Sequence, residues 1–386
     1  MLCRGVPCDG TELSAGDRRT CRPKRAVTMD ERAGVRAQGV AVGGPLPYPY
    51  LLFLGDTTEP SYAKTAFGLR DWVPERCVGE WACEGATVTT GLPRLAPKEA
   101  RLRGARSLVI GVANSGGVIV ESWIPYLVEA LEAGLDIVSG LHARLGDVPQ
   151  LKAAATRGGR RLIDVRTPPP NIPVGSGRKR SGKRLLTVGT DCALGKKYSA
   201  LALARAFKAR GLEADFRATG QTGILIAGAG IPMDAVVSDF EAGAAELLSP
   251  DAPAGHWDVI EGQGSLFHPA YAAVSLGLLH GSQPDVFVVC HEPGRERILG
   301  HEEYPLPSIG ETIDLTVRLG ARTNPAIRCG GVCLNTSALE AGAAAELLAR
   351  ESAWLGLPVA DPMRGGPEFE HLIDSCLATP PAGQKT

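Results

Sequence analysis

Short apolar runs that stop at glycine recur along the chain, and they predict the buried strands of a parallel sheet. In the first half such runs occupy residues 50–54 and 107–112. Between residues 123 and 133 apolar side chains recur every three or four positions, which predicts a helix with one apolar face. Another short strand is expected at residues 136–139. This succession of strand, glycine-rich loop, helix and strand is typical of a parallel α/β sheet.

The second half of the chain continues the alternation. We expect strands at residues 185–188, 259–261, 286–290 and 331–335. We expect helices at residues 196–210, 242–248, 309–319 and 337–350. The pattern therefore predicts an α/β protein with a parallel sheet in each half.

Polar and proline-rich stretches divide the chain of 386 residues, a length that suggests two domains. Residues 1–45 have no apolar period, so we expect a disordered N-terminal extension there, and one interpretation is that the working protein starts near Met29. The remaining segments are a first domain at residues 46–166, a linker at 167–183, a second domain at 184–379 and a tail at 380–386. Prolines and the basic run at residues 178–180 predict an irregular, solvated linker.

Composition narrows the class of protein. The formal net charge of −1 argues against a broad nucleic-acid surface. Apolar runs stay shorter than the ~18 residues that span a membrane, and residues 1–30 lack the apolar core of a secretion signal. We therefore expect a cytoplasmic protein with a small-molecule ligand, and a homo-oligomer as the usual default. The ten cysteines lack the spacing of a zinc site, so we expect reduced thiols and no metal.

The most specific motif is the segment LLTVGTDCALGKK at residues 185–197. An apolar strand enters a loop that ends in Gly-Lys at the start of a helix, an order that lets backbone N–H groups and a lysine surround a phosphate. The Gly-Thr-Asp start is similar to the P-loops of synthetases such as dethiobiotin synthetase. The residues assigned to cofactor binding in this loop are Gly189, Thr190, Asp191, Cys192, Ala193, Leu194, Gly195, Lys196 and Lys197.

Lys197 departs from the usual P-loop. A Ser or Thr normally follows the P-loop lysine, and its hydroxyl ligates Mg²⁺. A second cation at this position argues against ordinary Mg-ATP hydrolysis. It favours an anionic ligand that is held without that metal ligand.

Three further strand ends carry polar side chains, at the edge where open α/β sheets bind ligands. Glu261 ends one strand and is either a metal ligand or general base, or an acid satisfied by a helix N-terminus. His291 ends another and is either a proton acceptor or a packed structural histidine. Asn335 ends a third, where it either reads a purine or caps a helix.

The motifs together resemble the bacterial D-glutamate N-acetyltransferase family, which was formerly uncharacterised. The matching segments are GTDCALGKKYSALAL, TGQTG, SDFEAGAAE, EGQGS and CHEPGR, with GVANSGG and AGLDIVSGLH nearer the N-terminus. The resemblance covers about residues 47–375. It implies an N-terminal Rossmann-like domain and a C-terminal P-loop NTPase-like domain. It also implies acetyl transfer from acetyl-CoA to the amine of D-glutamate, a step in D-amino-acid catabolism.

The resemblance is compatible with the loop, because coenzyme A contains an ADP unit that a P-loop can hold without hydrolysing it. Acetyl transfer needs a base and an oxyanion donor. The residues expected to be catalytic are His291, Glu261 and Arg295. Asn335 is assigned to cofactor binding. The residues expected to bind substrate are Gln221, Thr222, Asp239, Gly262, Gly264 and Glu292, with Arg295 and Lys197 as carboxylate ligands.

Two alternatives remain open at this point. An ATP-dependent ligase or kinase resembling dethiobiotin synthetase would use ATP with Mg²⁺, and Lys197 counts against it. A non-catalytic nucleotide sensor would bind its ligand without turnover, and the clustered His291, Glu292 and Arg295 count against that.

Overall fold

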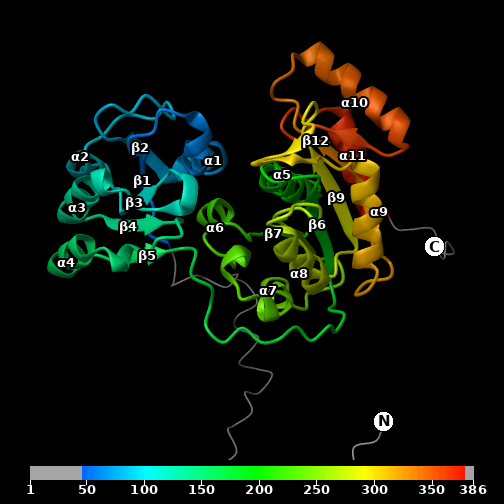
Figure 1. Cartoon of the computed structure of the whole chain (residues 1–386), viewed down its shortest axis with the longest axis horizontal. Helices are drawn as coiled ribbons and strands as arrows, with labels where there is room; N and C mark the ends of the chain where they lie inside the picture. The colour runs from blue at the N-terminus through cyan, green and yellow to red at the C-terminus, as the bar shows by residue number, and fades with distance from the viewer. Residues whose placement is uncertain (1–45, 379–386) are drawn as a thin grey trace, which may run out of the picture. The chain divides into compact units, whose positions relative to one another are not determined.

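The computed structural model describes residues 46–378 (Figure 1). The extension expected at residues 1–45, with its alternative start near Met29, and the tail expected at residues 380–386 lie outside the described residues.

A five-stranded parallel sheet with the order β2-β1-β3-β4-β5 forms first. Its strands are β1 (Tyr50–Phe53), β2 (Cys77–Trp81), β3 (Ser107–Ile110), β4 (Asp136–Ser139) and β5 (Leu162–Asp164). Its helices are α1 (Lys64–Trp72), α2 (Pro97–Leu102), α3 (Ile124–Glu132) and α4 (Pro149–Gly158). The strands β1, β3 and β4 are buried along their whole length, as parallel strands covered on both faces must be.

A six-stranded parallel sheet with the order β13-β12-β9-β6-β8-β7 follows. Its strands are β6 (Lys183–Gly189), β7 (Ala214–Arg217), β8 (Trp257–Ile260), β9 (Val286–His291), β12 (Arg328–Leu334) and β13 (Val359–Ala360). Its helices are α5 (Lys196–Ala209), α6 (Gln221–Ala227), α7 (Glu241–Leu248), α8 (Ala272–Ser282), α9 (Ile309–Gly320), α10 (Ala341–Leu355) and α11 (Pro367–Leu377). The short strands β10 (Arg297–Ile298) and β11 (His301–Pro305) pair separately and antiparallel.

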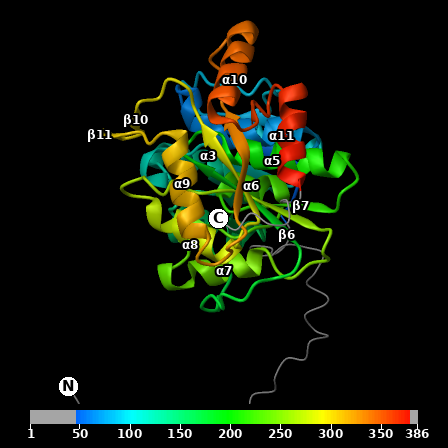
Figure 2. The same cartoon turned by 90° about the vertical axis from the view of Figure 1, so that its right-hand side faces the viewer.

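Helices cover both faces of the second sheet (Figure 2). On one face α5 and α11 pack against strand residues such as Val259 and Val288. On the other face α7, α8 and α9 pack around Phe287 and Val289. The predicted α/β class with parallel sheets is therefore confirmed.

The expected elements cover only part of the structure: the strands β2, β5, β7 and β13 and the helices α1, α2, α4, α6, α8 and α11 were not among them. The helix expected at residues 337–350 was placed too early, because α10 begins at Ala341 and the residues before it form a turn in which the Leu339 N–H donates to the Thr336 carbonyl (2.9 Å). The helix α8 was missed because its apolar residues are not confined to one face. The strand β7 was missed because it is a half-buried edge strand with charged residues.

The basic run at residues 178–180 is not uniformly solvated, so that prediction was wrong for Arg180. This side chain is buried, and its guanidinium donates to the carbonyls of Ser249 and Gly281, each at 2.7 Å. Burial lowers the pKa of Arg180 to about 10. Four prolines and two exposed basic neighbours suggested a solvated segment, whereas the carbonyls that bind Arg180 lie 69 and 101 residues away in the chain.

A shared core joins α1 of the first sheet to α5 and α6 of the second. Leu69 of α1 belongs to the same buried cluster as Leu201 of α5 and Ile224 of α6. The hydroxyls of Thr65 in α1 and Thr222 in α6 form a buried hydrogen bond of 2.9 Å. The first turn of α5, which carries the predicted phosphate-binding lysine, therefore lies close to a helix of the first sheet.

Candidate functional site

A cavity of about 780 Å³ lies at the carboxyl ends of the second sheet's strands and reaches α1. This volume falls within the range of about 300–1,000 Å³ typical of small-molecule sites. Residues assigned from the sequence that line it are Cys192, Ala193, Leu194, Gly195, Lys196, Lys197, Gln221, Thr222, Glu261, Gly262, Gly264, Arg295 and Asn335. Lining residues that the sequence analysis missed include Lys64, Phe67, Arg166 and Asp361.

The loop after β6 has the backbone of an anion site. Ala193 and Gly195 adopt left-handed conformations, with φ of 57° and 102°. Gly195 is the N-cap of α5 and offers no capping side chain, so the first N–H groups of that helix are left for a ligand. The Lys196 ammonium is buried beside them and donates to the Asp191 carbonyl at 2.7 Å.

Asp191 ties the loop to the segment after β9. Its buried carboxylate accepts from the Cys192 N–H (2.6 Å), the Leu299 N–H (2.8 Å) and the Arg295 guanidinium (2.9 Å). Arg295 also pairs with Glu292 and donates to the Cys192 carbonyl (2.8 Å). Two carboxylates of the protein therefore already balance the charge of Arg295. This arrangement argues against the expectation that Arg295 is free to bind a substrate carboxylate.

His291 lies at the end of β9, where its Nδ1 is 3.0 Å from the Thr190 hydroxyl. Burial lowers the pKa of His291 and Arg295 adds to this effect, while Glu351 and Glu292 act in the opposite direction. Neither His291 nor Glu292 lines the cavity within the described part of the chain. The structure therefore brings His291 to the phosphate-binding loop, in the packed setting that the sequence left open.

Glu261 is buried at the end of β8, and it lines the cavity. Its Oε2 accepts from the N–H groups of Thr219 (2.9 Å) and Gly220 (3.1 Å), at the start of α6. Burial raises the pKa of this carboxyl, while the two N–H groups and the nearby Lys197 lower it. This is the acid satisfied by a helix N-terminus that the sequence allowed, although Glu261 also remains at the cavity wall.

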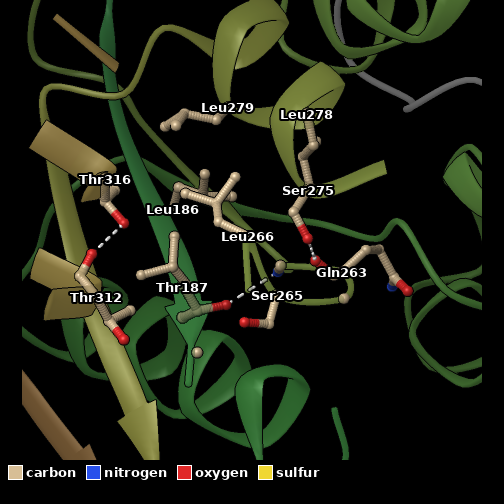
Figure 3. A pocket seen from close by; sticks show the side chains of 14 residues that line it. Leu186, Thr187, Gln263, Ser265, Leu266, Ser275, Leu278, Leu279, Thr312 and Thr316 are labelled. Carbon is tan, nitrogen blue, oxygen red and sulfur yellow. Dashed lines mark hydrogen bonds between the residues drawn. The ribbon is translucent and has the colours of Figure 1, made fainter. Parts of the chain in front are cut away.

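The glycine loop after Glu261 is held by two hydroxyls (Figure 3). The Gly262 N–H donates to the Thr187 hydroxyl (2.9 Å), and the Ser275 hydroxyl donates to the Gln263 carbonyl (2.6 Å). A Cβ on Gly262 would lie 1.7 Å from the Thr187 carbonyl oxygen, which explains the glycine. Because its N–H is already engaged, Gly262 does not offer that N–H to the substrate that the sequence predicts it to bind.

Gln221 and Thr222 open α6 and face the first sheet. When its amide is oriented to satisfy both neighbours, Gln221 donates to the Gly140 carbonyl (2.8 Å) and accepts from Arg166 (2.9 Å). Arg166 also pairs with Asp234. Arg166 follows no motif, so no sequence signal could have identified it.

Asp239 is exposed in the turn Ser238–Phe240 and is absent from the described residues that line the cavity. Asn335 does line it, and its side chain accepts from the Ser337 N–H at 3.3 Å. The alternative that Asn335 caps a helix was wrong, because the N-cap of α10 is Glu340.

Lys197 lies beside Lys196 in sequence but has different neighbours. Its Nζ is 4.9 Å from the ring centre of Tyr198 and 3.2 Å from where a Cβ on Gly68 of α1 would lie. Within residues 46–378 it has no hydrogen-bond or ion-pair partner, although it lines the cavity. Burial lowers the pKa of Lys197 to about 8; Glu261 and Asp71 act in the opposite direction, and Lys64 adds to the lowering.

Two groups among the described residues could hold a metal ion. Asp191, Cys192 and His268 place possible ligand atoms within 4.8 Å of one another, as do Asp215, His256 and Asp258. In the first group the Asp191 carboxylate already pairs with Arg295, and in the second both carboxylates pair with Arg217. These arginines disfavour a divalent cation at either place.

In the part of the chain that the structure describes, every helix is too short or too polar to cross a bilayer.

The sequence matches two family models. Residues 75–168 match the Rossmann-like domain DUF1611_N, and residues 173–371 match the P-loop domain DUF1611_C, both described as domains of unknown function.

Relatives with an assigned activity span nearly the same length. A protein from a Pseudoalteromonas species and one from Tritonibacter scottomollicae, both named D-glutamate N-acetyltransferase, are 49% and 48% identical over 330 residues. These alignments cover 86% of this chain and 98% of each relative. The crystal structure of a DUF1611 family protein from Anabaena variabilis is 34% identical, with a TM-score of 0.76, over 85% of this chain and 98% of that one.

Proposed function

The chain belongs to the DUF1611 family, and on this premise we propose that it transfers an acetyl group from acetyl-CoA to the amine of D-glutamate. Relatives that carry this activity in their names align with almost their whole length. The structural observation that carries the proposal is the cavity itself. It joins a phosphate-binding loop to a wall that holds Lys64, Arg166 and Lys197.

The phosphate side of the cavity fits coenzyme A. The first N–H groups of α5, the left-handed Gly195 and the Lys196 ammonium form a site for phosphate oxygens. We assign Asn335 to the same ligand because it lines the cavity beyond the loop. When bound, acetyl-CoA supplies the acetyl thioester that is the acetyl donor.

The departure at Lys197 supports acetyl-CoA over Mg-ATP as the ligand. The side chain that would ligate Mg²⁺ in an ordinary P-loop is replaced by an amine. That amine lies against Gly68 of α1 rather than beside Asp191. A ligand that is not hydrolysed does not require the missing metal ligand.

The opposite wall fits an acidic amino acid. D-glutamate carries two carboxylates, and Lys64 lines the cavity without a carboxylate partner among the described residues. Arg166 adds a second cation, which it shares with Asp234. Charge complementarity of this kind attracts and orients an anionic substrate.

The chemistry requires a neutral amine. The ammonium of D-glutamate must lose one proton before its nitrogen attacks the acetyl carbonyl. The C–N bond then forms, the C–S bond breaks, and the second proton of the amine leaves with the CoA thiol. His291 and Glu261 are the base candidates from the sequence, and Glu261 is the one that lines the cavity.

The test is thiol release from acetyl-CoA in the presence of D-glutamate, with L-glutamate and D-glutamine as comparison acceptors. We expect release that requires D-glutamate. ADP release from Mg-ATP without thiol release would contradict the proposal and favour a ligase.

We also propose that the protein is a cytoplasmic homo-oligomer. Light scattering of the purified protein would test the oligomeric state, and fractionation of the source cells would test the location.

A further inference from the structure

Lys197 occupies a slot built by three elements. Gly68 of α1 and Thr222 of α6 approach so closely that a Cβ on Gly68 would lie 2.7 Å from the Thr222 side chain. The Lys197 ammonium rests beside this contact, with the Tyr198 ring as its neighbour on α5. Gly68 has no side chain, so the Lys197 amine has room beside it and lines the cavity.

Few charged groups can balance the positive charge that Lys197 carries when it is protonated. The charged groups that face it are Glu261 at the end of β8 and Asp71 and Lys64 of α1. Among the described residues none of them forms an ion pair with Lys197 Nζ. An amine without a hydrogen-bond acceptor, next to a carboxylate that can stabilise a newly acquired charge, has the surroundings of a proton acceptor.

We propose that Lys197 is the catalytic base, and that its neutral amine takes the proton that the D-glutamate ammonium loses before acetyl transfer. This inference rests on the proposed function, because it names the proton acceptor for that reaction. It replaces the phosphate-binding role that the position of Lys197 in the P-loop suggests.

The proton transfer balances without any other reactant. One N–H bond of the substrate ammonium breaks, and an N–H bond forms on the lone pair of Lys197 Nζ. The substrate is left as a neutral amine, and Glu261 stabilises the new lysine ammonium by its charge. Lys197 then returns the proton to solvent through the cavity.

The rival candidates are less suitably placed. His291 is turned to Thr190 and does not line the cavity within the described residues. Glu261 lines the cavity and burial raises its pKa, but its Oε2 already accepts two backbone N–H groups, which oppose that rise. Lys197 has a single basic atom, and that atom has no hydrogen-bond partner in residues 46–378, whereas one of the two carboxylate oxygens of Glu261 is occupied. Its pKa of about 8 agrees with a base that works near neutral pH.

The test compares the wild type with Lys197→Ala and Lys197→Arg, using thiol release and direct measurement of acetyl-CoA binding. We expect Lys197→Ala to lower kcat/KM by about 10²–10⁴-fold with the acetyl-CoA Kd unchanged. Lys197→Arg should be equally slow, because arginine keeps the charge but does not deprotonate. Added ethylamine should restore part of the rate to Lys197→Ala. The matched control is Lys208→Ala, an exposed lysine on the same helix.

The pH dependence gives a second measurement. In the wild type kcat/KM should rise with pH and level off above about 8, where Lys197 is neutral. Glu261→Gln keeps an acceptor for the Thr219 and Gly220 N–H groups but removes the negative charge, so the levelling should move to lower pH. If Glu261→Gln instead abolished the reaction while Lys197→Arg stayed active, Glu261 would be the base.

Competitive labelling of the wild type with acetic anhydride, read by mass spectrometry, reports the pKa of Lys197 without any turnover. A Lys197 that titrates like an ordinary lysine would overturn the inference even if D-glutamate is acetylated. A wild type that releases no thiol would overturn the proposed function, and the labelling would then still report whether the amine is perturbed. A large rise in the acetyl-CoA Kd of Lys197→Ala would return Lys197 to phosphate binding.

Discussion

The two lysines that open α5 are adjacent in sequence but belong to regions of different character. Around Lys196 the polar groups are satisfied: its ammonium donates to the Asp191 carbonyl, and Asp191 is paired with Arg295. Around Lys197 they are not, because its amine faces the cavity between α1 and α6 without a partner among the described residues. On this difference we propose that the first region binds a ligand and the second serves proton transfer.

The largest effect on this comparison is expected when the charge of the half-buried Lys197 is removed. In the folded protein its pKa is about 8, below the unfolded value of about 10.4. The unfolded state therefore binds more protons between these values, so Lys197 costs stability in full below about pH 8, and the cost disappears as pH rises through that window. We expect Lys197→Met to raise the free energy of unfolding near neutral pH by up to about 3 kcal/mol.

Urea unfolding of wild type and Lys197→Met below and above this window measures the effect. The two proteins should differ most at the lower pH and converge at the higher. A loss of both stability and activity in Lys197→Met would show that Lys197 is a structural residue. A gain of stability together with a loss of turnover is the result expected of a functional group whose charge costs stability in the folded protein.

Lys196→Ala tests the other side of the comparison. A hydrogen bond to a charged group contributes about 1.5–3 kcal/mol, so the acetyl-CoA Kd should rise about 10–150-fold. Isothermal titration calorimetry measures it, with Lys208→Ala as the control on the same helix. An unchanged Kd would remove the phosphate-binding assignment of the loop.

Gly68→Ala probes the slot without touching a charge. The new Cβ would meet Thr222 at 2.7 Å and Lys197 Nζ at 3.2 Å, and overpacking of this kind costs about 1–3 kcal/mol. The control is Gly342→Ala in α10, where nothing lies within 4 Å of the added Cβ and a gain of about 1 kcal/mol is expected. Thermal unfolding compares the two, and equal gains would show that the slot is not tight.

His291→Ala should have the smallest effect. It removes the hydrogen bond to Thr190, which contributes about 1 kcal/mol of stability. We expect turnover to fall far less than in Lys197→Ala, since the ring does not line the cavity within the described residues. A loss of turnover as large as that of Lys197→Ala, with cofactor affinity intact, would restore His291 as the base.

Much of the fold was predictable because its signals are local. The apolar runs of β1, β3, β4 and β9 end at turns that the chain itself marks, and the strand–loop–helix order around Lys196 occupies contiguous residues. Local signals failed for α8, whose burial on several sides erases the helical period, and for β7, whose position at a sheet edge leaves it half polar.

The sequence by itself determined the α/β class, the phosphate-binding loop and the strand ends that carry polar side chains, since each depends on neighbours within a few residues. The tertiary structure alone decided the state of those side chains. Arg295 is neutralised by Asp191, which precedes it by 104 residues, and the Gly262 N–H is taken by Thr187 from 75 residues away. Lys197 is set apart from Lys196 because the shared core brings α1 against it, a contact that no local pattern encodes.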